Sequence, residues 1–202
     1  MRVALGLKAR TGRAVLVAIG GDVDEPRFVE RVQIRLLPDG DFAPYHVAAD
    51  LEPTAARAHV ERSIATARQL ATSAIRDAAR RLAEAGHEPC GCAVLVGAGL
   101  PEWTVDQIVA VHVRMHQAEG ELFRDVLVAG ARACGLEPTT LPEKSALDAA
   151  AKKLGLERAR LDACVAALGK SAGPPWGKDQ KEAAAAALVA LHPASIGRAT
   201  SS

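Results

Sequence analysis

Residues 3–19, VALGLKARTGRAVLVAI, contain two runs of valine, leucine, isoleucine and alanine that are separated by a short polar segment. The polar segment, KARTG at residues 8–12, has a glycine near its end, as tight β-turns often do. Both apolar runs are rich in residues that favour strands. The stretch therefore predicts a β-hairpin with strands over residues 3–7 and 13–19.

The residues after the hairpin predict a third strand and then an alternation of helices and strands. Residues 28–37 place Val32, Ile34 and Leu36 two apart, which is the period of a strand. After an irregular segment at 41–51, apolar residues keep helical spacing to about residue 85. The other predicted elements are a helix over 53–85, a buried strand at 90–97, a strand at 138–141 and helices at 147–154, 161–168 and 179–191.

A single long helix is predicted for residues 105–134. Its apolar residues fall within a sector of about 80° around the helix axis; they are Ile108, Val111, Met115, Ala118, Leu122, Val126 and Ala129. Thr104 stands where an N-cap belongs, and Gly135 follows the last periodic residue as a C-terminal glycine does. This helix also carries the densest group of chemically capable side chains, namely His112, His116, Glu119, Glu121 and Arg124.

Composition and order together predict one α/β domain over residues 1–192, followed by a disordered tail at 193–202. A strand meander followed by alternating α and β units predicts a mixed sheet with helices on both faces. The net charge of +1 gives no global electrostatic argument for nucleic acid or for an anionic membrane. No apolar run approaches the roughly 18 residues that span a bilayer, so we expect a cytoplasmic protein.

The order of predicted elements resembles the ribonuclease H-like fold, and two segments resemble the RuvC-type Holliday-junction resolvases. In that group the first strand ends in Gly-(Ile/Val)-Asp before a turn with Thr/Ser-Gly, and residues 3–19 are similar to this opening. The group's last helix has two carboxylates one turn apart before an alanine-rich run, as in DQKEAAAAALVAL at 179–191. Residues 116–124 and 173–181 also resemble segments of bacterial proteins without an assigned activity.

The resemblance implies two Mg²⁺ ions held by acidic residues on the first strand, the fourth strand and the last helix. This chain departs from that pattern, since Leu7 and Lys8 occupy the first-strand position and Gly-Ala-Gly at 97–99 ends the fourth strand. Only Asp179 and Glu182 remain. We therefore predict a degenerate RuvC-like domain that binds nucleic acid or a protein, with no two-metal catalysis and no cofactor.

The nucleic-acid hypothesis rests on a local group of basic residues. In the resembled fold the end of the first strand borders the active-site groove, and Lys8, Arg10 and Arg13 crowd that hairpin. Lys181 lies on the last predicted helix beside Glu182. Cationic side chains at such a groove can contact phosphates.

Two alternatives stay open at this point. The first is a divergent metal-dependent nuclease or other hydrolase that uses His116 and Glu119 with Asp179 and Glu182, and Mg²⁺ or Mn²⁺ as cofactor. His112, His116 and Glu119 are also metal-ligand candidates, because two histidines one turn apart can share a zinc ion. The competing interpretation is that these histidines are hydrogen-bonded at the edge of the core. The second alternative is a homodimeric scaffold, which long alanine-rich helices suggest.

Overall fold

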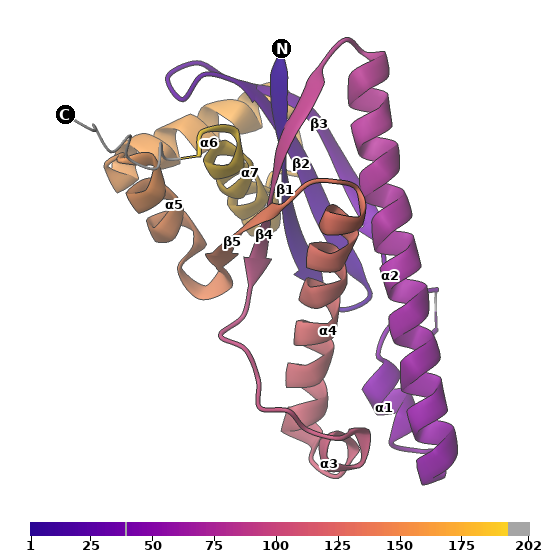
Figure 1. Ribbon diagram of the computed structural model, residues 1–202. Coiled ribbons are helices and arrows are strands. Elements are labelled where there is room, and N and C mark those ends of the chain that lie inside the picture. The colour runs from indigo at the N-terminus through magenta and orange to yellow at the C-terminus, as the bar shows by residue number, and fades with distance from the viewer. Residues whose placement is uncertain (39, 194–202) are drawn as a thin grey trace, which may run out of the picture.

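The computed structural model describes residues 1–38 and 40–193, and its centre is a five-stranded mixed sheet in the order β3-β2-β1-β4-β5 (Figure 1). The strands are β1 (Arg2–Arg10), β2 (Arg13–Gly21), β3 (Pro26–Arg35), β4 (Glu88–Val96) and β5 (Pro138–Pro142). The first three form an antiparallel meander, and β4 and β5 extend the sheet in parallel with β1. The predicted sheet is confirmed.

Helices cover both faces of this sheet (Figure 1). One face carries α1 (Pro44–Ala48), α2 (Pro53–Glu84), α3 (Val105–Val109) and α4 (His112–Ala133). The opposite face carries α5 (Ala146–Leu154), α6 (Arg158–Ala172) and α7 (Lys178–Leu191), and the short 3-10 helix η1 (Glu143–Ser145) follows β5. The three-layer arrangement is that of the ribonuclease H-like fold, as the sequence predicted.

The alternation of side chains along β1 decides which residues meet α7. Leu5 and Leu7 belong to the core under α2 and α4, so Gly6 and Lys8 point to the opposite face. A Cβ atom at Gly6 would overlap the backbone carbonyl oxygen of Ala183. The backbone of α7 therefore lies directly on β1, and residues 183–187, all alanine and all 0% exposed, allow this approach.

The predicted helix over residues 105–134 is wrong at one point, because the chain breaks between α3 and α4. Val111 has extended backbone angles (φ −138°, ψ 110°) and a side chain 37% exposed. Residues 108, 109, 111 and 113 are β-branched, which weakens helix propensity here. The side chain of Arg114 donates a hydrogen bond to the carbonyl of Gln107 at 3.0 Å. This bond replaces the helical hydrogen bond that the Gln107 carbonyl lacks, because the N–H of Val111 bonds to Ile108 instead. The predicted cap at Thr104 is present, as is the left-handed Gly135 (φ 75°).

Other differences from the sequence predictions are small, and one of them matters for function. The segment at 41–51, predicted as irregular, contains α1, and α6 runs to Ala172, so the loop predicted from residue 170 begins later. The first strand continues through Lys8 to Arg10, which places Lys8 inside the sheet instead of in the turn. Residues 194–202 of the predicted tail lie outside the described residues. No helix within 1–38 and 40–193 has the length and apolarity to cross a membrane.

Candidate functional site

Lys8 is buried among carboxylates at the end of the sheet where β1, β4 and β5 finish. The residue is 1% exposed, and its ammonium Nζ donates a hydrogen bond to Glu182 Oε2. The same Nζ lies 3.4 Å from Glu143 Oε1 and 3.8 Å from Asp179 Oδ1. We name Lys8, Glu143, Asp179 and Glu182 the lysine–carboxylate cluster. Glu143 was not predicted as a site residue.

Two arginines bind the carboxylates of this cluster from other elements. Arg10 on β1 donates through Nε to Asp179 Oδ2 at 2.9 Å and through a second nitrogen to Oδ1. Arg124 on α4 donates to Glu143 Oε2 at 2.9 and 2.6 Å and to Glu121 Oε2 at 3.1 Å. The side chains of Glu121 and Arg124 are 23% and 21% exposed, and Arg124 connects α4 to η1 through Glu143.

Ion pairing shifts the pKa values of Asp179, Glu143 and Arg10. The hydrogen bond and charge of Arg10 hold the pKa of Asp179 below its ordinary value, against the opposing effect of burial. Burial would raise the pKa of Glu143, but hydrogen bonds and charge from Arg124 and Lys8 together lower it. The hydrogen bond to Asp179 raises the pKa of Arg10. These groups therefore stay ionised over the neutral range.

The lowered pKa of Asp179 predicts a loss of stability in acid. A carboxyl group whose pKa is lower in the folded chain stabilises the fold above its unfolded pKa of about 4, and that contribution disappears as the pH falls through the folded pKa. The difference in melting temperature between the wild type and Asp179→Asn should therefore shrink as the pH falls below about 4. Asp50→Asn, at an exposed carboxylate, is the control, and a pH-independent difference for Asp179→Asn would contradict the prediction.

The two-Mg²⁺ site implied by the fold does not fit these residues. Hard divalent ions need several oxygen ligands and their negative charge. Here the ammonium of Lys8 lies among the carboxylates that would have to bind the ions. Gly97 and Ala98, which follow β4, supply no side-chain oxygen, and a Cβ at Gly97 would lie 2.8 Å from Glu121 Oε2. The arrangement holds a protein cation where the fold leads one to expect metal ions.

A cavity of about 360 Å³ opens beside the lysine–carboxylate cluster. Its lining is rich in cationic side chains, which are those of Lys8, Arg10, Arg124, Lys144 and Lys178, and it includes the carboxylate of Glu143. Lys144 and Lys178 are exposed, and Lys178 Nζ lies 3.8 Å from Glu182 Oε1. Lys8, Arg10 and Arg124 donate hydrogen bonds to carboxylates, whereas Lys144 and Lys178 donate none to the residues that the structure describes, so these two exposed lysines are the cations that an anion in the cavity would meet most readily.

Three histidines form a separate cluster at the N-terminal end of α4. His46 on α1 joins His112 and His116, and one ring nitrogen of each lies within 4.8 Å of the others. Glu119 does not complete this group as a ligand, since its buried carboxylate lies 2.8 Å from His46 Nδ1. The pairing of His112 with His116 follows from helical spacing. His46 was missed, because it lies in a segment that the sequence predicted as irregular.

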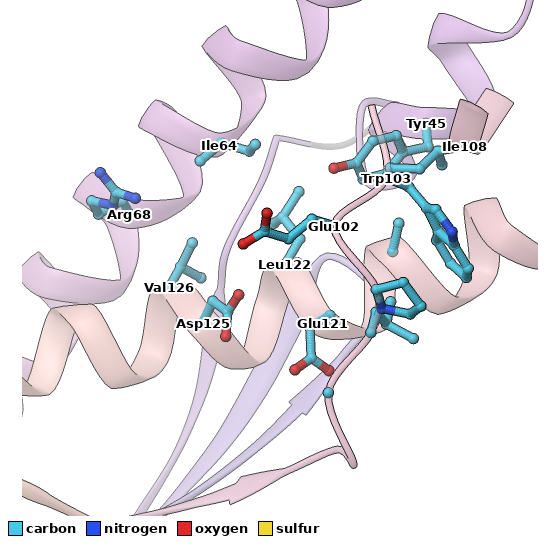
Figure 2. Close-up of a pocket in the computed structure, with 14 residues that line it drawn as sticks. Tyr45, Ile64, Arg68, Glu102, Trp103, Ile108, Glu121, Leu122, Asp125 and Val126 are labelled. Carbon is cyan, nitrogen blue, oxygen red and sulfur yellow. The ribbon is translucent and has the colours of Figure 1, made fainter. Parts of the chain in front are cut away.

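A second cavity, of about 470 Å³, is lined by residues of α4, α2 and the segment before α3 (Figure 2). Its labelled side chains include the carboxylates of Glu102, Glu121 and Asp125 together with the ring of Tyr45. Burial and the neighbouring Glu121 raise the pKa of Asp125. Arg68 is the cationic residue in the lining. This carboxylate-rich surface is a poor site for phosphate in comparison with the cavity beside Lys8.

The other site residues predicted from the sequence lie on different elements and do not form one site. His116 and Glu119 lie on α4, whereas Asp179 and Glu182 lie on α7 across the sheet. Among the described residues, no hydrogen bond or ion pair connects one set with the other. Arg13 is exposed at the hairpin and lines another cavity with Arg35 and Phe42, and Lys181 is exposed on α7.

The fold of this chain is similar to that of solved structures. A structure of T. thermophilus RuvC in complex with Holliday junction substrate is similar at a TM-score of 0.52 and 13% identity, with 92% of this chain and 90% of that chain covered. A second Thermus thermophilus RuvC structure gives a TM-score of 0.48 at 15% identity, with 92% and 91% covered. No protein-family model matches the sequence, and no curated protein matches it. The similarity at a TM-score of 0.52 shows that the chain has a ribonuclease H-like, RuvC-like fold, and 13% identity shows the fold alone.

Proposed function

We propose that this chain is a nucleic-acid-binding module in which the lysine–carboxylate cluster takes the place of a two-metal catalytic site. The observation that carries the proposal is the buried ammonium of Lys8 in contact with Glu143, Asp179 and Glu182. Two-metal hydrolysis depends on carboxylates that are available to bind the ions. In this chain the cationic side chains neutralise the carboxylates, so the carboxylates are not available to bind metal ions.

The cationic cavity supports nucleic acid as the ligand. Phosphate oxygens accept charge-assisted hydrogen bonds from lysine and arginine, and Lys144 and Lys178 are exposed beside the cluster. The structure of T. thermophilus RuvC with Holliday junction substrate supports a nucleic-acid ligand for this fold. Aromatic residues make up 3% of the chain, so we expect backbone contacts to dominate over base stacking.

Salt-dependent binding is the first test of the proposal. Fluorescence anisotropy with labelled four-way junction, duplex and single-stranded DNA should show an affinity that falls as salt rises from about 50 to 200 mM, because phosphate contacts release counterions. The double variant Lys144→Gln/Lys178→Gln should bind more weakly and reduce the slope of log K against log salt by about 1–2. Its fold is checked by an unchanged melting temperature.

The control is Lys152→Gln/Lys153→Gln, which removes the same charge from an exposed part of α5. This variant should bind like the wild type. Undetectable or salt-insensitive binding would contradict the proposal, as would an equal loss in both double variants. Cleavage of the DNA with Mg²⁺ or Mn²⁺ that Asp179→Asn abolishes would instead favour the divergent nuclease.

The predicted homodimer has to use surfaces other than the alanine run of α7. Residues 183–187 are fully buried within the chain, so they are not available to a second copy. Light scattering at high protein concentration tests whether a dimer forms. A monomer under those conditions would contradict the prediction.

A further inference from the structure

The three histidines on α1 and α4 are arranged as a ligand set. The ring centroids of His46 and His116 are 4.5 Å apart, those of His112 and His116 are 4.6 Å apart, and those of His46 and His112 are 5.3 Å apart. One ligand nitrogen of each lies within 4.8 Å of the others. We propose that His46, His112 and His116 bind a divalent transition-metal ion of the zinc class.

Glu119 holds the ring of His46 in place, as such a site requires. It is 2% exposed, and its Oε1 lies 2.8 Å from His46 Nδ1 and accepts a hydrogen bond from the backbone N–H of His46 at 3.3 Å. Metal-binding histidines usually donate their second ring nitrogen to a carboxylate or carbonyl, which fixes the tautomer and the ring orientation. The contact with Glu119 occupies Nδ1 and leaves Nε2 of His46 to bind the metal.

Local structure brings the ligands together. His112 is the first residue of α4, so the break at Val111 determines where its ring emerges, and His116 follows one turn later on the same face. His46 is held by α1, whose neighbouring Pro44 and Tyr45 are buried. A metal bound here would connect α1 to α4 and should stabilise the folded chain.

The donor set indicates the kind of ion and the kind of site. Imidazole nitrogens suit zinc, copper, nickel and iron, whereas magnesium and calcium prefer oxygen. His112 and His116 are exposed and His46 is half-buried, so a tetrahedral ion with three protein ligands keeps a position open to solvent. The site is independent of the lysine–carboxylate cluster, so either proposal can fail without the other.

The test uses the full chain without a histidine tag. Isothermal titration with Zn²⁺ should give one site per chain, and Co²⁺ should give a visible spectrum of nitrogen ligation without thiolate charge transfer. Thermal melting should occur at a higher temperature with Zn²⁺. Glu119→Gln should weaken Zn²⁺ binding by about 10- to 100-fold, the usual cost of losing such a support.

Matched variants separate the site from adventitious histidine binding. His112→Ala and His116→Ala change exposed side chains and should keep the metal-free melting temperature while losing the Zn²⁺ site. His87→Ala, in the turn after α2, should bind Zn²⁺ like the wild type. The proposal is overturned if the wild type shows no one-to-one binding, or if both His112→Ala and His116→Ala retain it.

Discussion

Replacement of Lys8 with alanine is expected to destabilise the chain by about 3–5 kcal/mol, the usual cost of removing one partner from a buried ion pair. Lys8 is 1% exposed, and its principal partner Glu182 is 5% exposed. Without the ammonium, the carboxylate of Glu182 loses its hydrogen bond and faces Glu143 and Asp179 with less compensation. The fold therefore depends on the cation for keeping these groups together.

Urea denaturation measures this effect directly. Lys181→Ala removes the same charge from an exposed position next to Glu182 and should change the free energy of unfolding by no more than about 0.5 kcal/mol. The double variant Lys8→Met/Glu182→Leu should be much more stable than Lys8→Ala, because apolar residues of similar size can replace a buried pair. A Lys8→Ala variant within about 1 kcal/mol of the wild type would contradict the assignment of a buried, mutually dependent pair.

The Lys8→Ala variant also tests whether the ammonium of Lys8 prevents divalent ions from binding to the carboxylates of the cluster. If the ammonium keeps such ions out of the cluster, Mg²⁺ or Mn²⁺ should raise the melting temperature of Lys8→Ala and leave that of the wild type unchanged. The physical reason is linkage, since a ligand stabilises only the state that binds it. Equal stabilisation of both proteins would indicate that the ions bind elsewhere.

Much of the fold could be predicted because its signals are local. Strand periodicity in β1 to β3 and helical spacing in α2 extend over many residues, and few arrangements accommodate a meander followed by α/β units. The break at Val111 was not found, because the apolar sector continues through it: Ile108 and Met115 are both buried. Periodicity reports which face is apolar, and it is insensitive to one residue in an extended conformation.

The candidate site was only partly predictable, because its residues come from distant elements. Topology alone allows Lys8 to meet Asp179 and Glu182, since β1 and the last helix are neighbours in this fold. Glu143 follows the last residue of β5, and the parallel strands β4 and β5 end at the same edge of the sheet, so its position was a usable signal. His46 had no such signal, since α1 is short and its place against α4 depends on tertiary packing.

Replacement of Gly6 with alanine is expected to destabilise the chain by more than about 4 kcal/mol, a size that indicates a severe packing defect. The added Cβ would overlap the carbonyl oxygen of Ala183 and lie 2.7 Å from the backbone nitrogen of Ala187. Both atoms belong to the backbone of α7, so no rotation of a side chain relieves the overlap. The helix would have to move away from β1, and the contact of Lys8 with Glu182 would be lost with it.

Alanine substitutions at two other glycines provide a graded comparison with Gly6→Ala. A Cβ at Gly91 on β4 would lie 2.7 Å from the carbonyl oxygen of Ala190, so Gly91→Ala should destabilise the chain less than Gly6→Ala. A Cβ at Gly120 in α4 would meet the guanidinium nitrogen of Arg124 at 3.1 Å, so this side chain would have to shift by only a few tenths of an ångström, which its hydrogen bonds to Glu121 and Glu143 allow. Because alanine is favoured over glycine in a helix by about 1 kcal/mol, Gly120→Ala should be neutral or stabilising.

Urea denaturation of the three variants measures the order of their effects, and Gly91→Ala keeps the test informative if Gly6→Ala does not fold. The expected order of stability is Gly120→Ala, then Gly91→Ala, then Gly6→Ala. If Gly91→Ala and Gly6→Ala were both as stable as the wild type, α7 would not lie directly on the sheet. Close packing of α7 on β1 is also what brings Glu182 within reach of a lysine inside the sheet, so such a result would remove the geometric basis of the lysine–carboxylate cluster.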